Sequence, residues 1–189
     1  MQRGKELWFK YRIPFSIYLF SRLLVFAGFA FVVFNRHVPF FCDSIDQSQS
    51  CLLAKWDAGK YLQIAQNCYG NIEGGIPPRT FAFFPTYPAM LRALSFGSPL
   101  ALQIVSLFVS FLLGLVTSAL LWTMVRTRLD EDKSKLAIAL FWFMPMTFAL
   151  SMSYAEVVAI PLAIATLVAH GKRRWVLATI LGSFAASFK

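Results

Sequence analysis

Long apolar blocks separated by short polar turns dominate the chain. The first block covers residues 14–35 and matches the roughly 20 residues needed to span the hydrocarbon core of a bilayer. Arg22 interrupts this block directly after Ser21. An ionisable side chain within a span indicates a function or an internal partner, whereas snorkelling to the headgroups is the alternative. The pattern predicts a first transmembrane helix over residues 14–35 and leaves both interpretations of Arg22 open.

Residues 36–98 form the one long segment that is not continuously apolar. Within it, residues 51–67 follow the pattern of an amphipathic helix, with Asp57 near the first turn, where the helix dipole favours a carboxylate. The aromatic run 81–94 is too short to span a bilayer and is interrupted by two prolines, one of them Pro85. We therefore expect a long outer loop that carries short interfacial helices.

The apolar blocks after this segment predict four more membrane helices. Residues 99–125 form the least interrupted block. The block after residue 135 is too long for one span, so we expect two spans, over 136–152 and 156–169, with a hinge between them. Pro145 and Pro161 are expected to kink these spans. Residues 175–188 begin a last span. The expected fold class is all-α, as a polytopic membrane bundle of about five transmembrane helices.

Basic residues lie at the edges of the apolar blocks. The chain has 18 Lys and Arg against 9 Asp and Glu, which gives a formal net charge of +9. Cations beside spans set the orientation of a membrane protein and meet anionic headgroups, so nucleic-acid binding is not indicated. We expect the N-terminus and the turns 126–135 and 172–174 in the cytosol. Residues 36–98 then lie on the outer or luminal side.

All three cysteines, Cys42, Cys51 and Cys68, lie in the segment 36–98. A disulfide between Cys42 and Cys51 requires that this segment face an oxidising compartment, and three free thiols fit the sequence equally well. The sequence contains no Cys and His spacing typical of a metal site. Neither a metal nor another cofactor is expected.

Asp57 is the acidic residue with the most specific surroundings on the expected outer side. It lies between Trp56 and a pair of small residues that leave room for a substrate, and Trp56 and Tyr61 are flat side chains on which a sugar ring packs. A helix N-cap is the alternative role for Asp57. Glu156, which opens a predicted span beside Tyr154, is the second candidate acid.

Four runs in this chain resemble a known family in their order and spacing. The runs are Trp56-Asp57-Ala58-Gly59 with Tyr61 and Ile64-Ala65, then Tyr69-Gly70, then Phe84-Pro85 with Tyr87-Pro88, then Pro145, Phe148, Ser151 and Ser153-Tyr154 with Glu156. They resemble the PIG-V family of mannosyltransferases, which adds the second mannose in glycosylphosphatidylinositol anchor synthesis and has bacterial relatives. The Ser21-Arg22 pair also recurs in that family. Because family members are considerably longer, this chain is expected to be an N-terminal portion.

The resemblance implies the GT-C fold, whose members take sugar from a polyprenyl-phosphate donor such as dolichyl-phosphate-mannose. An acid in the first outer loop is their usual catalytic base, and Asp57 occupies that position. The expected substrate-binding residues are Arg22, Trp56, Lys60, Tyr61, Pro85, Tyr87, Tyr154 and Glu156. The cation that balances the leaving phosphate is expected among Lys55, Lys60, Arg79 and Arg22.

The partners implied by this resemblance are the polyprenyl-phosphate-sugar donor, a lipid-linked glycan acceptor such as a glycosylphosphatidylinositol precursor, and membrane lipid. The implied location is the endoplasmic reticulum membrane in a eukaryote, or the plasma membrane in a bacterium. The alternative function is a non-catalytic membrane subunit that works with a partner in a glycosylation complex. A transporter fragment is a weaker alternative, because only Arg22 would supply a polar path across the spans.

Overall fold

A computed structural model of the chain describes residues 2–43, 51–69 and 82–188, with side chains from residue 10 onward. Every regular element within these residues is a helix. The helices are α1 (Gln2–Arg36), α2 (Asp57–Asn67), α3 (Thr86–Ser95), α4 (Pro99–Val125), α5 (Glu131–Phe143), the 3-10 helix η2 (Pro145–Ser151), α6 (Glu156–Gly171) and α7 (Trp175–Ser187).

Two described helices are long and apolar enough to cross a membrane, namely α4 and the Lys10–Arg36 part of α1. Helices α5 and η2 qualify together as a third, although they meet at a bend of 73°. Helices α6 and α7 are apolar but shorter. The predictions of an all-α fold and of membrane-helix character are thus confirmed. Length and composition support two or three spans within the described residues, where the sequence had predicted about five.

Some helix bounds differ from those expected. Helix α4 begins and ends at the expected residues, 99 and 125, whereas α1 extends back to Gln2 because polar residues end an apolar span without ending its helix. The kink expected at Pro145 is confirmed as a bend of 73°, and it breaks the expected span 136–152: α5 stops at Phe143 and Met144 is extended, with ψ 135°. The residue before a proline is pushed out of the α conformation, and Pro145 cannot donate to the preceding turn.

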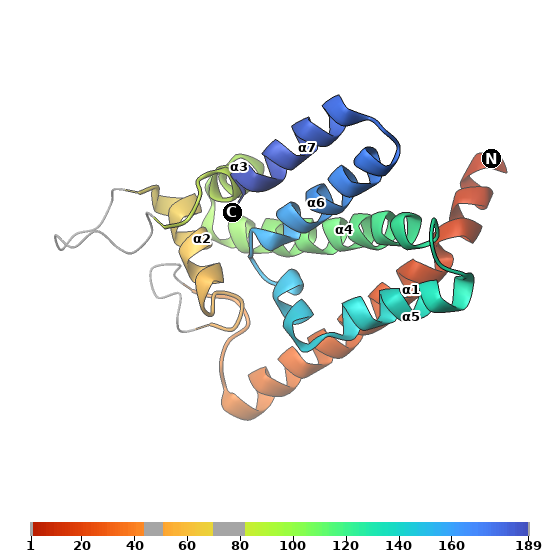
Figure 1. Cartoon of the computed structure of the whole chain (residues 1–189). Coiled ribbons are helices and arrows are strands. Elements are labelled where there is room, and N and C mark those ends of the chain that lie inside the picture. The colour runs from red at the N-terminus through yellow and green to blue at the C-terminus, as the bar shows by residue number, and fades with distance from the viewer. Residues whose placement is uncertain (1, 44–50, 70–81, 189) are drawn as a thin grey trace.

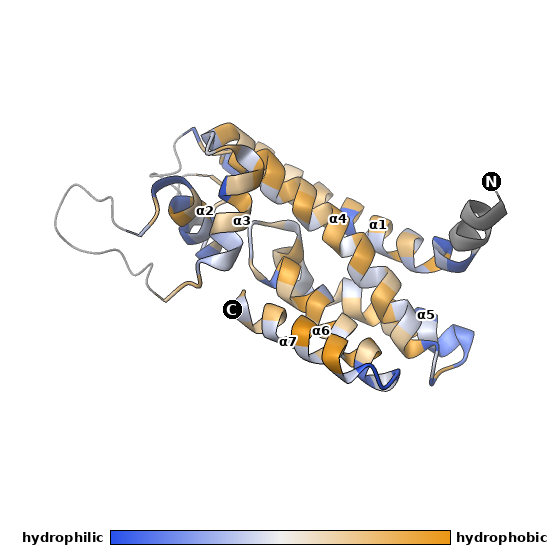
Figure 2. Ribbon diagram, turned by 90° about the horizontal axis from the view of Figure 1, so that it is seen from above, coloured by the Kyte–Doolittle hydropathy of each residue, from blue (hydrophilic) through white to orange (hydrophobic). Residues whose placement is uncertain are grey.

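Helix α4 is the centre of the bundle: it contacts α6, α1 and α5, and it contacts α2 and α3 near its start (Figure 1). Helix α7 packs on α6. The N-terminus and the α4–α5 and α6–α7 turns lie at one end of the bundle, while α2 and α3 lie at the other (Figure 1). This is the arrangement that the charge-based orientation requires. Figure 2 shows apolar helices between polar segments at the two ends.

Small and polar side chains line the inner face of α4. Its buried polar residues are Gln103, Ser106, Ser110, Thr117 and Ser118. The hydroxyls of Ser106 and Ser110 donate within α4, and Ser110 also donates to the Met152 carbonyl at 3.0 Å. At Gly114 the ring of Tyr18 lies directly against the helix backbone. Small residues permit such close approach between membrane helices, so this face joins α4 to α1 and to the segment before α6.

Candidate functional site

The guanidinium of Arg22 lies inside the bundle, and only 3% of the residue is exposed. Its Nη1 donates to the Thr147 carbonyl at 2.8 Å and to the Ser151 hydroxyl at 2.7 Å. Its Nη2 donates to the Trp142 carbonyl at 3.2 Å. A broken helix leaves carbonyls without intrahelical donors, and Arg22 supplies donors where α5 gives way to η2. The snorkelling interpretation is therefore wrong, and Arg22 has internal partners.

Helix α2 begins at Asp57, six residues later than the pattern at residue 51 had indicated, directly after a strained residue. Trp56 has a φ of 54° and a ψ of −133°, a conformation that costs a non-glycine residue of order 1–3 kcal/mol. Trp56 is 61% exposed, and its ring centroid lies 5.9 Å from that of Phe148 in η2. Asp57 is exposed in the first turn. The structure thus brings the Trp56-Asp57 pair against the run that begins at Pro145.

Two carboxylates, one opening α2 and one opening α6, flank the same two tyrosines. Burial and then the charges of Glu156 and Asp57 raise the pKa of Tyr61 to about 12. Burial and then the charges of Asp57 and Glu156 raise the pKa of Tyr154 to about 12 as well. Both phenols therefore stay protonated at neutral pH, and each O–H can donate a hydrogen bond. The backbone N–H groups of Asp57 and Ala58 donate to the Tyr154 hydroxyl oxygen.

The aromatic residues before and within α3 cover Tyr61. The rings of Phe83 and Tyr87 meet the Tyr61 ring edge-on, at centroid distances of 5.0 and 5.2 Å. Tyr61 is 6% exposed and Tyr87 is fully buried, whereas Pro85 is exposed before α3. Burial also raises the pKa of Tyr87. Of the two rings expected to stack on a sugar, the structure leaves that of Trp56 open and covers that of Tyr61, because α3 packs over α2.

Helices α2 and α3 are tied together at the far end of α2. Arg92 donates through Nη1 to the Ala65 carbonyl at 3.0 Å, which supplies a donor to the last turn of α2. Tyr69 donates to the Phe83 carbonyl. An open cavity of about 450 Å³ lies beside this junction and is lined by Tyr69, Phe83, Phe84 and Pro85. Its size falls in the range of small-molecule sites. Phe83 belongs to the aromatic run 81–94 noted in the sequence, whereas the sequence pattern did not single out Arg92.

The four expected phosphate-balancing cations lie in different places. Lys60 is half-buried on α2, and its Nζ lies 3.4 Å from the Gln63 side-chain oxygen. It follows Asp57 by three positions, a spacing that puts the two residues on the same helix face. Lys55 is half-buried just before α2. Arg22 is interior, as described above, and Arg79 lies outside the described residues, as do Gly70 and Phe81.

A disulfide anchors the segment between α1 and α2. Cys42 and Cys51 are bonded, with Cα atoms 5.0 Å apart, and Cys68 is a free, exposed thiol. The backbone of Cys42 donates to Gln103 Oε1 at 2.7 Å and accepts from Gln103 Nε2 at 3.0 Å. Of the two alternatives the sequence left open, the structure contains the disulfide. Together, the disulfide and the two hydrogen bonds to Gln103 hold the segment between α1 and α2 against the first turns of α4.

Within the described ranges, no three His, Cys, Asp or Glu side chains come together as metal ligands would. No family model, curated protein or solved structure matches the chain. The protein can therefore be classified only from its own structure. Its described residues form helices, and two long apolar helices among them are compatible with a membrane protein. Its candidate site lies at the end of the bundle formed by α2, α3, η2 and the start of α6.

Proposed function

We propose that this protein is a membrane glycosyltransferase that transfers mannose from a polyprenyl-phosphate donor to a lipid-linked glycan. The observation that carries the proposal is the meeting of runs that are distant in sequence. Trp56 contacts Phe148, and the charges of Asp57 and Glu156 act on the same two phenols. These are the runs that resemble the PIG-V family. Their convergence on one end of the bundle supports a shared site.

Asp57 is the proposed catalytic base. It is exposed beside the open ring of Trp56, so an acceptor hydroxyl has access to its carboxylate. In the proposed step the carboxylate takes the hydroxyl proton while the acceptor oxygen bonds to the anomeric carbon. The bond between that carbon and the phosphate oxygen breaks, and its electron pair leaves with the polyprenyl phosphate. The configuration at the anomeric carbon is inverted.

The surrounding groups take supporting roles in this proposal. Glu156 is less suited to be the base, because its Oε2 is buried and the residue lines an internal space that Trp142 and Ser110 also line. Tyr154 remains protonated and donates a hydrogen bond to the sugar or to a carboxylate. Lys60, on the Asp57 face of α2, is the favoured cation for the leaving phosphate.

The donor's long apolar tail gives a reason for the membrane helices, since it is dissolved in the bilayer. The proposed orientation puts α2 and α3 on the outer or luminal side. The Cys42–Cys51 disulfide supports this side, because disulfides persist in oxidising compartments. The membrane is then that of the endoplasmic reticulum in a eukaryote, or the plasma membrane in a bacterium.

The test is mannose transfer in proteoliposomes, from dolichyl-phosphate-mannose to a glycosylphosphatidylinositol precursor that carries one mannose. Asp57→Asn keeps the shape of the side chain and removes the base, so transfer should fall by about a hundredfold or more. Asp43→Asn is the matched control, because Asp43 is an exposed acid outside the site, and should retain transfer. Full transfer by Asp57→Asn would refute the proposed role of Asp57. Absence of transfer by the unaltered chain, together with co-purification of a larger enzyme, would favour the non-catalytic subunit.

A further inference from the structure

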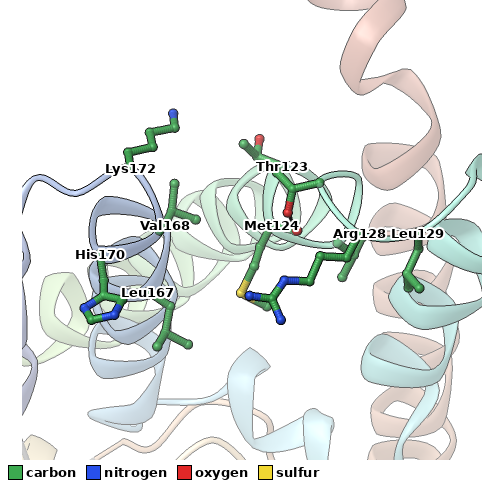
Figure 3. A pocket seen from close by; sticks show the side chains of 11 residues that line it. Thr123, Met124, Arg128, Leu129, Leu167, Val168, His170 and Lys172 are labelled. Carbon is green, nitrogen blue, oxygen red and sulfur yellow. Dashed lines mark hydrogen bonds between the residues drawn. The ribbon is translucent and has the colours of Figure 1, made fainter.

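A cavity of about 720 Å³ lies at the end of the bundle opposite to Asp57, between the last turns of α4 and α6. Its lining includes three basic side chains, Arg128, His170 and Lys172. Arg128 reaches from the chain after α4 toward Leu167 on α6 (Figure 3). His170 and Lys172 lie on the α6 side, and the Lys172 side chain points away from Arg128. The cavity therefore combines positive charge with an approach between two apolar helices.

The remaining walls of this cavity are largely apolar. They include Met124, Val125, Leu129, Leu167 and Val168. Leu167 is 58% exposed, and it belongs to the outer surface of an apolar helix. A water-soluble anion gains nothing from such walls, whereas a lipid has an acyl chain to lay against them. The lining thus fits a ligand that is anionic at one end and apolar at the other.

The positive charge of the cavity is not neutralised by the nearest acids. Asp130, Glu131 and Asp132 form their ion pairs with Lys133 and Lys135 of the same segment, at 2.9 to 3.0 Å. Within the described residues, no ion pair involves Arg128 or Lys172. These two cations are therefore available to an anion from outside the chain.

The side chains of Arg128 and Lys172 do not cap the ends of α4 and α6. The last carbonyls of α6 accept hydrogen bonds from the backbone, with Lys172 N at 3.2 Å from Val168 O and Arg174 N at 3.0 Å from Ala169 O. At the end of α4, Arg126 N lies 3.0 Å from Trp122 O. Backbone groups thus satisfy helix ends that basic side chains often cap.

We propose that this cavity binds the phosphate headgroup of an anionic membrane lipid, with an acyl chain along the α6 wall. Arg128, whose guanidinium lies beside Leu167 (Figure 3), contacts the phosphate, and Leu167 contacts the chain. The site lies at the other end of the bundle from the proposed mannosyltransferase site and does not depend on that proposal. Basic residues beside spans are common as topology signals, so the test separates a specific pocket from general positive charge.

The experiment is native mass spectrometry of the full chain in detergent, titrated with dioleoyl phosphatidylglycerol or dioleoyl phosphatidylcholine. We expect the phosphatidylglycerol to bind and the phosphatidylcholine to bind at least about tenfold more weakly. Each cation near an anionic lipid contributes about fivefold in affinity, so Arg128→Gln should weaken binding about fivefold. Leu167→Trp, which fills the cavity without changing its charge, should also weaken binding.

The matched control is Arg173→Gln, which removes the same charge at a residue of the α6–α7 turn that does not line the cavity. It should change the affinity by less than about twofold. An equal loss of affinity in Arg128→Gln and Arg173→Gln, or equal binding of the two lipids, would overturn the proposal in favour of general charge. Binding of inorganic phosphate or glycerol 3-phosphate as tight as that of phosphatidylglycerol would overturn the lipid as ligand. Unchanged affinity for phosphatidylglycerol in Leu167→Trp would overturn the proposed contact between the acyl chain and Leu167.

Discussion

Nη1 of Arg22 lies 2.7 Å from the hydroxyl of Ser151, although the two residues are 129 positions apart in the chain. This hydrogen bond and the one to Thr147 O connect the first membrane helix to the 3-10 helix that precedes α6. Phe148, whose ring contacts Trp56, lies between those two residues. Arg22 therefore influences the candidate site from inside the bundle, by holding the segment against which the Trp56-Asp57 pair packs.

Replacing Arg22 should destabilise the protein. Arg22→Met leaves the carbonyls of Trp142 and Thr147 without this donor in a buried region, and the free energy of unfolding should fall by about 3 kcal/mol. Arg22→Lys keeps the charge but loses the planar fork of donors. Its free energy of unfolding should therefore lie between those of the unaltered protein and Arg22→Met. Unfolding in mixed micelles measures both changes.

Arg36→Gln is the control for this series, because Arg36 is exposed in the last turn of the same helix. Its effect should stay below about 0.5 kcal/mol. Stability of Arg22→Met equal to that of the unaltered protein would contradict the structural role of Arg22.

A methyl group at Gly114 should disturb the contact between α1 and α4. The added Cβ would collide with the Tyr18 ring, which is buried and whose hydroxyl donates to the Phe111 carbonyl at 3.0 Å. Overpacking of this kind costs about 1–3 kcal/mol, so the melting temperature of Gly114→Ala should fall. Gly28→Ala on α1 is the control, because no atom lies within 4 Å of its added Cβ. It should be neutral or slightly stabilising. A loss of the same size in both variants would rule out the proposed collision.

Alkaline stability should depend on Tyr154. Burial and then the charge of Asp57 raise the pKa of Tyr154 from 10.0 to about 12 in the folded chain. The folded state therefore holds this proton more tightly than the unfolded state, and the resulting stabilisation is complete below pH 10 and is lost as the pH rises to about 12. In Tyr154→Phe the fall in stability across this window should be shallower. Denaturation at a series of pH values, with tyrosinate absorbance as the second signal, measures this fall in stability. An equal dependence of stability on pH in Tyr154→Phe and the unaltered protein would contradict the role of Tyr154.

The exposed ring of Trp56 should contribute to donor binding if the proposed function holds. Trp56→Ala removes the open face beside Asp57, and the KM for the donor should rise about fivefold, as expected for an aromatic contact of roughly 1 kcal/mol. Trp56→Phe keeps an aromatic face, so its KM for the donor should be close to that of the unaltered protein. Trp175→Ala is the matched control, since Trp175 is 58% exposed against 61% for Trp56 and lies at the other end of the bundle. Equal KM values for the unaltered protein and Trp56→Ala would exclude sugar stacking on this ring.

Sequence patterns predicted the elements better than their interruptions. The bounds of α4 match an uninterrupted apolar block. The sequence predicted a kink at Pro145, but not that α5 would end at Phe143 and give way to a 3-10 helix, because apolar content continues through Met144 and Pro145 while the backbone conformation changes. The start of α2 was placed six residues early at residue 51, since an amphipathic pattern does not reveal the positive φ of Trp56.

The candidate site was predicted only in part. Residue types and their order pointed to Asp57, Trp56 and Glu156, and the structure adds that their elements adjoin. It also buries Tyr61 under α3, which no local pattern indicates, because that burial depends on how two short helices pack. Arg92 was not found for the same reason: its partners are backbone carbonyls of α2, and a carbonyl has no signature in the sequence.

Local chemistry alone determined that the chain is helical, that it has membrane-helix character and where its charges lie, since these follow from the apolar blocks and their basic edges. Tertiary structure decided what each polar group inside those blocks does. Arg22 satisfies the carbonyls of a broken helix, and Gln103 holds the disulfide-bonded segment. The physical reason is that buried polar groups must find partners, and the partners here are 61 to 129 positions away, beyond the reach of any periodic pattern.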